Sequence, residues 1–244
     1  MISQAKSLFR QAGLFPVARN LYRNLSPSHR KERLFNKRFY NEMINPGDLC
    51  FDIGANLGQT IEALLENNAV VVAVEPNPNC LPVLNYQFPD NPNLTIVNKG
   101  IGSTPGSAQL HFKGTDSTAS MRDDWPFATD QTLEVEIITL DDMIAQFGLP
   151  KFLKVDVEGF ELEVFKGLSQ PISLIYFEMH GDEMDLVFQI FERLSTIGEI
   201  AGINVVSGDN SSWLIDGWVK PNELLAKLGE PVPRRANIVV KMNT

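Results

Sequence analysis

Four chemically active side chains follow two apolar segments in the second half of the chain. Asp156 and Glu158 come at the end of KFLKVDV (151–157), and Glu178 and His180 come at the end of ISLIYFEM (172–179). An isolated carboxylate is costly to bury, so carboxylates where a buried strand stops point to a function at that edge. A histidine near carboxylates is suited to accept a proton near neutral pH. We therefore expect these four side chains to converge on a reacting group.

The same oxygen-rich group could bind a metal ion. Mg²⁺ prefers oxygen ligands, and it can lower the pKa of a bound hydroxyl group. Asp156 and Glu178 are the candidate ligands. His29 and His111 have no acidic strand ends beside them, and we expect surface or packing roles for both.

A glycine-rich turn follows an apolar segment in the sequence FDIGANLGQT (51–60). Asp52 lies at the end of the expected strand, and Gly54, Asn56 and Gly58 occupy the turn that leads into a helix. A strand, a glycine turn and a helix place backbone N–H groups and a helix N-terminus at the ligand-binding edge of a parallel sheet. The spacing does not match GxGxxG, and no GK[ST] follows, so dinucleotide and phosphate-loop patterns are not met.

Glu75 ends the next apolar segment, VVVAVE, and comes 23 positions after Asp52. An acid at this place can accept hydrogen bonds from both ribose hydroxyls of an adenosine, as in NAD and S-adenosylmethionine sites. Because the middle glycine needed to accommodate a pyrophosphate is missing, the pattern favours S-adenosylmethionine over NAD.

Apolar strands and amphipathic helices alternate from residue 45 onwards, which predicts an α/β fold with a mostly parallel sheet and helices on both faces. Segments of alternating apolar and polar residues at 107–112 and 132–138 predict two further strands. The long polar loop between them, 114–127, is a candidate for a mobile cover over the site. Trp125 in this loop is a candidate to line the pocket of the acceptor. The expected strands are 49–53, 69–75, 94–98, 107–112, 132–138, 151–157, 172–179, 201–206 and 236–242. The expected helices are 57–67, 79–88, 140–147, 160–168 and 182–196.

The first 44 residues differ from the rest in charge and pattern. Residues 1–40 contain nine Lys or Arg and one acid, whereas the whole chain of 244 residues has a net charge of −9. Helical spacing predicts two short helices within 2–24, broken at Pro16, and a third at 30–43. We interpret 1–44 as a basic arm or lid and 45–244 as the main domain. The acidic main domain argues against a nucleic-acid groove, while the basic arm could contact a membrane surface.

Composition is that of a soluble globular protein, with 43% hydrophobic and 21% charged residues. Cys50 and Cys80 lie in or beside apolar segments without CxxC spacing, so we expect two reduced core thiols. No segment is long and apolar enough to span a membrane, and the first residues lack the apolar core of a secretory signal. A cytoplasmic location is the resulting expectation.

Four segments, in this order, resemble the FkbM family of S-adenosylmethionine-dependent methyltransferases. They are FDIGANLGQT, VVAVEPNPN, ITLDDMI and FLKVDVEGFELEVFKGL. The first is shared by many methyltransferases, and the last is much more specific to this family. The resemblance covers roughly residues 45–180. It implies a Rossmann-like domain with a seven-strand sheet whose last strand is antiparallel, and O-methylation of a hydroxyl on a sugar, glycan or secondary metabolite.

The resemblance also implies roles for individual residues in binding the methyl donor. Asp52, Gly54, Asn56 and Gly58 would surround its methionine part, and Glu75 its ribose. The adenosine would lie near three further residues, namely Asn77, Lys99 and Gly100. Asp156 would contact the amino group of the donor or position the acceptor, alongside Glu158, Glu178 and His180 as candidate catalytic residues.

Two other functions stay open at this point. One is a non-catalytic module that binds S-adenosylmethionine, and the other, less favoured by the glycine spacing, is an NAD-dependent oxidoreductase. A methyltransferase acting on nucleic-acid bases is disfavoured, because the residues after the strand at 151–157 do not read Asn/Asp-Pro-Pro-aromatic.

Overall fold

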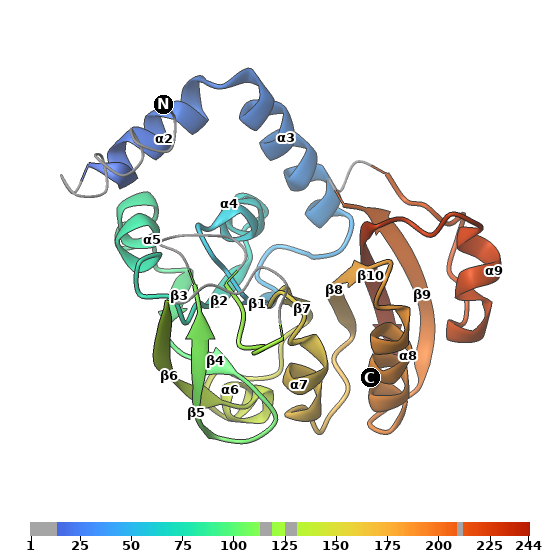
Figure 1. Cartoon of the computed structure of the whole chain (residues 1–244). Helices are drawn as coiled ribbons and strands as arrows, with labels where there is room; N and C mark the ends of the chain where they lie inside the picture. Colours follow the sequence, from blue (N-terminus) through green and yellow to red (C-terminus); the bar gives the residue numbers. More distant parts are fainter. Residues whose placement is uncertain (1–13, 113–118, 125–130, 209–211) are drawn as a thin grey trace.

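A seven-strand sheet runs through the centre of the molecule (Figure 1). The computed structural model describes residues 14–112, 119–124, 131–208 and 212–244. The strand order is β3-β2-β1-β7-β8-β10-β9, with β10 antiparallel to both of its neighbours and parallel pairing among the first five strands. The implied seven-strand sheet is therefore confirmed. The strands are β1 (Leu49–Ile53), β2 (Val70–Val74), β3 (Leu94–Val97), β7 (Phe152–Val155), β8 (Leu174–His180), β9 (Ile200–Ser207) and β10 (Arg235–Met242).

The central strands are apolar because helices cover both faces of the sheet. One core lies between the sheet and helices α6, α7 and α8, and the other between the sheet and helices α3, α4 and α5. These helices are α3 (Pro27–Asn41), α4 (Gln59–Glu66), α5 (Leu81–Gln87), α6 (Leu140–Phe147), α7 (Glu161–Lys166) and α8 (Met184–Ser195). The helices expected in these regions are confirmed: α6 has the predicted ends, and the ends of the others differ by one to three residues. Cys50 and Cys80 are both buried thiols, and neither belongs to a disulfide bond.

A second, three-strand sheet lies beside the central one (Figure 1). It contains β4 (Gly100–Ile101), β5 (Gly106–His111) and β6 (Thr132–Ile138), in the order β4-β6-β5. The alternating segments are thus strands, as predicted. Parts of the polar loop between them, 113–118 and 125–130, lie outside the described residues. The predictions that Trp125 lines the acceptor pocket and that the loop is a mobile cover concern these residues and stay predictions.

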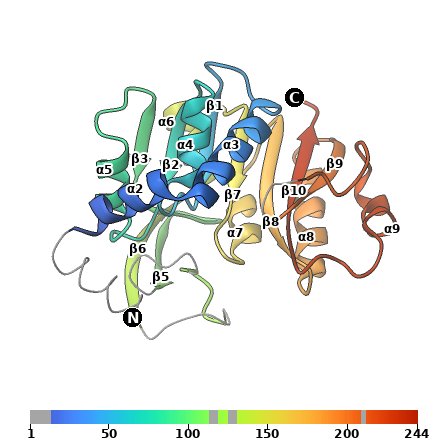
Figure 2. The same cartoon turned by 90° about the horizontal axis from the view of Figure 1, so that it is seen from above.

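Two N-terminal helices lie across α4 and towards α5 (Figure 2). Pro16, which was expected to separate two helices, lies in the first turn of α2 (Phe15–Leu25), where its missing N–H group leaves no bond unmade. The helix expected before it lies outside the described residues. The helix expected at 30–43 begins earlier, because Pro27 likewise occupies the first helical turn of α3. The aromatic ring of Tyr40, near the end of α3, packs against that of Phe152 in β7 with centroids 5.7 Å apart.

Near the C-terminus, a short helical segment precedes β10 and was not predicted. It consists of a 3-10 turn (Pro221–Glu223) followed by α9 (Leu224–Leu228). Leu224 is the only buried residue in this segment, so the segment is too short to show the apolar periodicity that predicts a helix.

Candidate active site

A cavity opens at the carboxyl ends of β1, β2, β7 and β8. The turns after these strands contribute Gly54, Glu75, Asp156 and Glu158 to its lining, and the small sheet closes another side with Ser120 and its neighbours. The remaining walls come from α3, through Glu32, Asn36 and Tyr40, and from β8 and β10, through Tyr176, Glu178, Arg235 and Asn237. The cavity thus lies at the edge where open α/β sheets bind ligands.

The turn after β1 is held against the turn after β7. Gly54 has φ +81°, and a Cβ atom built on it would lie 1.8 Å from the carbonyl oxygen of Asp156. This glycine is therefore required by the close approach of two protein segments, whereas the sequence suggested the approach of a ligand. Gly58, at φ +80°, similarly leaves space for Phe88 and Leu84 of α5.

Glu75 is buried at the end of β2 and is fixed by two backbone groups. One carboxylate oxygen accepts a 2.7 Å hydrogen bond from the N–H of Asn56, and the other accepts a 2.8 Å bond from the N–H of Asn77. Burial raises the pKa of Glu75 to about 7, although these two hydrogen bonds oppose the shift. Asn56 itself has φ +47°, so the turn presents its N–H group to Glu75.

Lys154 is a buried cation between two carboxylates. Its Nζ lies 3.4 Å from Asp52 Oδ1 and 3.0 Å from Asp156 Oδ2. Burial disfavours the charged amine, but the charges of Asp156 and Asp52 outweigh this effect and raise the pKa of Lys154. Burial also raises the pKa of Asp52, while Lys154 lowers it. Asp52 is fully buried below the cavity, whereas Asp156 lines it.

The turn after β7 contains two consecutive residues in the left-handed region. Glu158 has φ +54° and Gly159 has φ +88°. A glycine adopts this conformation readily, but for glutamate it is strained, and such strain persists where neighbouring groups hold it. Ser120 provides one such hold, because its Oγ donates a 2.8 Å hydrogen bond to the carbonyl oxygen of Glu158.

Glu161 provides the other hold on this turn. Its Oε1 accepts hydrogen bonds from the N–H groups of Val157, at 3.1 Å, and Gly159, at 3.3 Å. The side chain is buried, and burial raises its pKa to about 7. Glu161 lies in the first turn of α7, and its side chain turns inward to close the loop.

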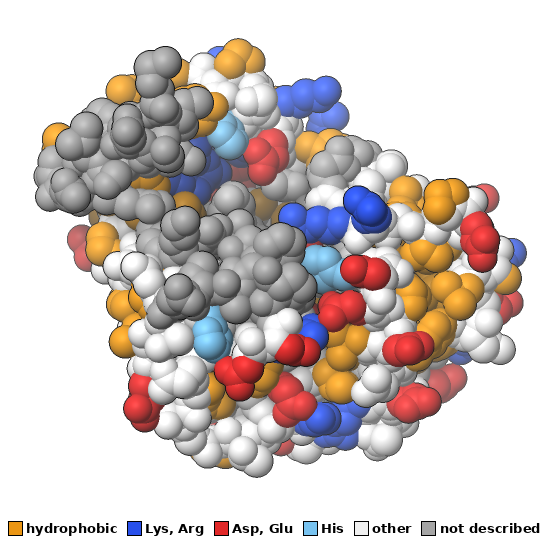
Figure 3. All heavy atoms as spheres, in the orientation of Figure 1, with side chains coloured by type: hydrophobic (Ala, Val, Ile, Leu, Met, Phe, Trp, Pro, Cys, Tyr) orange, Lys and Arg blue, Asp and Glu red, His pale blue; other side chains and the backbone are white. Residues whose placement is uncertain are grey.

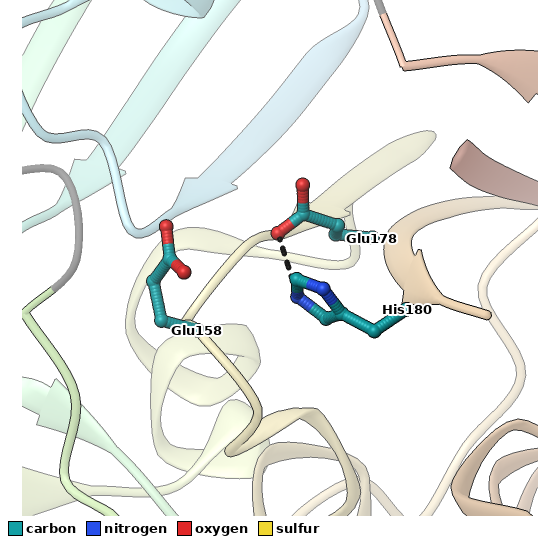
Figure 4. Close-up of side chains that lie close together, drawn as sticks. All are labelled: Glu158, Glu178 and His180. Atoms are coloured by element: carbon teal, nitrogen blue, oxygen red, sulfur yellow. Dashed lines mark ion pairs between the residues drawn. The ribbon is translucent and has the colours of Figure 1, made fainter. Parts of the chain in front are cut away.

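Glu158, Glu178 and His180 come together at the cavity, as Figure 4 shows, with one ligand atom of each within 4.8 Å of the others. His180 Nε2 lies 3.3 Å from Glu178 Oε2, and Arg235 Nε donates to Glu178 Oε1. Arg235 lies directly opposite His180 in the antiparallel pairing of β8 and β10. Three of the four predicted catalytic residues therefore converge, while the fourth, Asp156, pairs with Lys154.

Electrostatic surroundings distinguish the members of this group. Burial, together with the charges of Asp156 and Glu178, raises the pKa of Glu158 to about 8. Burial alone would raise the pKa of Glu178 too, but hydrogen bonds from His180 and Arg235 lower it. The hydrogen bond to Glu178 raises the pKa of His180. Glu158 is thus the carboxyl group that changes charge near neutral pH, and Glu178 is held as an anion.

The predicted Mg²⁺ ligands, Asp156 and Glu178, both line the cavity, and each already faces a basic side chain. Asp156 contacts a lysine, and each oxygen of Glu178 already faces a basic side chain, Arg235 or His180. Mg²⁺ would have to displace these groups, so the residues present do not fit that ion well. No step of the reaction proposed below uses a metal ion.

The three residues predicted to lie near the adenosine, Asn77, Lys99 and Gly100, are not among the residues that line the cavity. Lys99 pairs with Glu136 at 2.6 Å, and Gly100 packs against Ile137 and Met121. Asn77 is buried, and its Oδ1 accepts a 3.0 Å hydrogen bond from the N–H of Asn79. His29 and His111 contact Glu32 and Asp123, and neither belongs to the catalytic group.

Sequence reasoning missed Ser120, Glu161 and Arg235 as contributors to the site. Ser120 lies in a described segment of the polar loop, 119–124, without a motif of its own. Arg235 begins β10, and only the register of that strand reveals that it faces Glu178. No pattern in the local sequence could have identified either residue.

The chain is similar in sequence to known methyltransferases. The Methyltransferase FkbM domain family matches residues 52–200, more than half of the chain. Hexuronic acid methyltransferase AglP of Haloferax volcanii is 29% identical over 175 residues, which cover 68% of this chain and 71% of AglP. Among solved structures, a TehB-like SAM-dependent methyltransferase of Corynebacterium glutamicum aligns over 86% of this chain and 88% of its own, with TM-score 0.47 and 11% identity. Precorrin-6y C5,15-methyltransferase of Geobacter metallireducens aligns over 87% of both chains, with TM-score 0.43 and 13% identity.

Proposed function

Because the chain belongs to the FkbM family of S-adenosylmethionine-dependent methyltransferases, we propose that it transfers a methyl group to a hydroxyl of a carboxylate-bearing sugar. The observation that carries the proposal is the position of Glu158. This carboxyl group lines the cavity from a strained turn, has a pKa raised to about 8, and lies within reach of the Glu178–His180 pair. A group with these properties is suited to accept the proton of an alcohol.

The donor would occupy the part of the cavity formed by the turns after β1 and β2. Each oxygen of Glu75 accepts one backbone hydrogen bond, and a carboxylate oxygen has lone pairs for a second donor, such as a ribose hydroxyl. The predicted residues Asp52, Gly54, Asn56 and Gly58 form or support this turn, and Asp156 lies beside it. When bound, S-adenosylmethionine supplies a methyl group that is already activated by its sulfonium charge.

The chain's own residues then have two tasks, which are to align the acceptor hydroxyl and to remove its proton. Glu158 is the proposed base. His180 is not part of the cavity lining, so we assign it a positioning role through its contact with Glu178. Asp156, paired with Lys154, is a candidate for contacting the amino group of the donor.

Arg235 supports an acceptor that carries a carboxylate. Its Nε is bonded to Glu178, while its terminal nitrogens have no partner among the described residues and its side chain is 59% exposed at the cavity. The free edge of a guanidinium group matches a carboxylate in a bidentate hydrogen bond. The relative AglP is a hexuronic acid methyltransferase, which agrees with a uronic acid as the acceptor class.

The test uses the purified full-length chain with labelled S-adenosylmethionine and two matched acceptors, a glucuronic acid glycoside and the corresponding glucoside. We expect methyl transfer to the uronic acid, with an O-methyl group identified by NMR, and a much lower kcat/KM for the glucoside. Arg235→Lys keeps the charge beside Glu178 but lacks the bidentate edge, so it should raise KM for the uronic acid and leave the glucoside unaffected.

Other outcomes would contradict the proposal. If the wild type and Arg235→Lys both methylate the two acceptors at equal rates, the enzyme does not recognise the carboxylate of the acceptor. Binding of S-adenosylhomocysteine without methyl transfer to any hydroxyl would support a non-catalytic module, and binding of NAD alone would support an oxidoreductase.

A further inference from the structure

The inner face of α2 is polar. Arg19 Nη1 donates a 2.8 Å hydrogen bond to Gln87 of α5, and Arg23 Nη2 lies 2.6 Å from a carboxylate oxygen of Glu62 in α4. None of the residues in α2 is classed as buried. The helix is therefore attached to the main domain through its arginine side chains, whereas a helix on a globular protein ordinarily buries its apolar face.

The outer face of α2 is apolar. Leu14, Val17, Leu21, Tyr22 and Leu25 are between 43% and 70% exposed, and their spacing of three and four residues places them on one side of the helix. Together with the first turn of α3 they line a shallow groove. An exposed, contiguous apolar surface of this kind marks a site that contacts a membrane or the apolar surface of another protein.

The outer face of α3 continues this surface with positive charge. Arg30, Lys31, Lys37 and Arg38 are exposed, and their side chains have no hydrogen bond or ion pair with a described residue. Leu34, 62% exposed, lies among them on the same helical face. Figure 3 shows hydrophobic and basic side chains at the end of the molecule that carries α2 and α3, with most acidic side chains on the rest of that face.

Charge and apolarity together indicate the partner. Residues 1–40 carry a net charge of +8, and the remaining residues carry −17. A second copy of the chain would bring two basic surfaces together, and a nucleic acid would leave the apolar side chains without a partner. An anionic lipid surface provides both an apolar layer and negatively charged headgroups, and it repels the acidic remainder of the protein.

We propose that the outward faces of α2 and α3 bind the surface of an anionic phospholipid bilayer. The leucines and Tyr22 would enter the boundary between headgroups and acyl chains, and the four cations of α3 would contact lipid phosphates. In the described part of the chain no helix combines the length and apolarity needed to cross a membrane, so this contact lies in the interface. The inference does not rest on the proposed enzymatic reaction.

The experiment measures flotation of the full-length protein with vesicles of phosphatidylcholine alone, or with 30% phosphatidylglycerol (about the anionic fraction at which surface charge matters). We expect binding only to the anionic vesicles, weakened by added salt. Leu21→Glu with Leu25→Glu should abolish it. Lys37→Gln with Arg38→Gln should reduce affinity about fivefold for each cation removed.

Matched control variants change similar residues elsewhere on the surface. Leu149→Glu with Leu225→Glu alters two leucines that are 47% and 46% exposed, and Lys151→Gln with Lys227→Gln removes two exposed cations. These variants should bind vesicles like the wild type. Thermal unfolding of every variant establishes that the exposed substitutions leave the fold intact.

Three results would overturn the proposal. The first is equal binding to neutral and anionic vesicles, and the second is unchanged binding by the Leu21 and Leu25 variant. The third is a wild type that binds no vesicles and is a dimer in size-exclusion chromatography, while the Leu21 and Leu25 variant is a monomer. This result would identify the face as an interface between two copies of the chain.

Discussion

The side-chain oxygen of Ser120 donates a 2.8 Å hydrogen bond to the main-chain carbonyl of Glu158. The contact joins two segments 38 residues apart, and it holds a glutamate with φ +54° at the edge of the cavity. The small sheet therefore takes part in the site through the backbone of the proposed base.

Replacing Ser120 with alanine should lower kcat by about tenfold, because misplacement of a catalytic group by a fraction of an ångström reduces the rate substantially. KM for the donor should stay unchanged, since Ser120 does not contact the turns after β1 and β2. Steady-state kinetics on both substrates measure this, with the exposed Ser107→Ala in β5 as a control. An unaltered kcat in Ser120→Ala would show that the bond does not position Glu158.

The pH dependence of the reaction should follow Glu158. Its pKa is about 8, and the unprotonated form is needed to accept a proton, so kcat/KM for the acceptor should rise with pH through about 8 and then level off. Glu158→Gln should lose this rise and reduce kcat by roughly 100-fold to 10,000-fold. A pH profile that persists in Glu158→Gln would assign the titration to another group.

Substitutions at Glu178 and His180 should move that profile in opposite directions. After burial and Asp156, the negative charge of Glu178 is the next contribution that raises the pKa of Glu158, whereas the charge of His180 lowers it. Glu178→Gln should therefore shift the rise in kcat/KM to lower pH, and His180→Asn should shift it to higher pH. Identical shifts in both variants would mean that the substitutions act through structural damage.

Glu161 should matter for stability more than for charge. In Glu161→Ala the N–H groups of Val157 and Gly159 lose their acceptor, which should reduce the free energy of unfolding by about 2 kcal/mol. Glu161→Gln keeps an acceptor oxygen and should be far less destabilised. Chemical denaturation measures both, and Glu163→Ala, on the same helix and partly exposed, is the control.

The same residue should also leave a signature in the pH dependence of stability. Its folded-state pKa of about 7 lies above the ordinary value of 4.5. Its contribution is therefore fully present below pH 4.5 and is lost as pH rises through about 7. Glu161→Gln cannot ionise, so its unfolding free energy should fall less than that of the wild type between these two pH values.

Removal of divalent cations should leave the methyl transfer unchanged. Both oxygens of Glu178 face basic side chains, Arg235 and His180, and Asp156 faces Lys154. Dialysis against EDTA followed by the standard assay checks this expectation. Loss of activity that Mg²⁺ restores, in a protein with unaltered thermal unfolding, would require a metal at the cavity and a different role for Arg235.

Much of the site was predictable because parallel strands end at one edge of a sheet. That rule alone brings Glu158, Glu178 and His180 near one another and places Glu75 beside them. The resemblance implied that the last strand is antiparallel, but the local sequence contains no information on long-range register, so the pairing of Arg235 with His180 could not be foreseen.

Other features are ambiguous in the sequence because two physical causes produce the same residue. An acid in the first turn of a helix is stabilised by the helix dipole, yet Glu161 is there to bind the preceding turn. A proline inside an apolar helical pattern can mark either the end of one helix or the start of the next, and Pro16 and Pro27 both stand at helix starts, where the restricted φ of proline is favourable. The fold decides between such alternatives through contacts distant in sequence.

The 1.8 Å gap between a hypothetical Cβ on Gly54 and the carbonyl oxygen of Asp156 has a consequence for protein engineering. The turn after β1 and the turn after β7 are about a hundred residues apart in the chain, and their backbones pack directly against each other. Because the contact is with a main-chain atom, any residue at position 156 would make it, and every chimaera of this fold therefore needs a glycine at position 54. Libraries that randomise the cavity should therefore leave position 54 as glycine and diversify the walls contributed by α3 and β10.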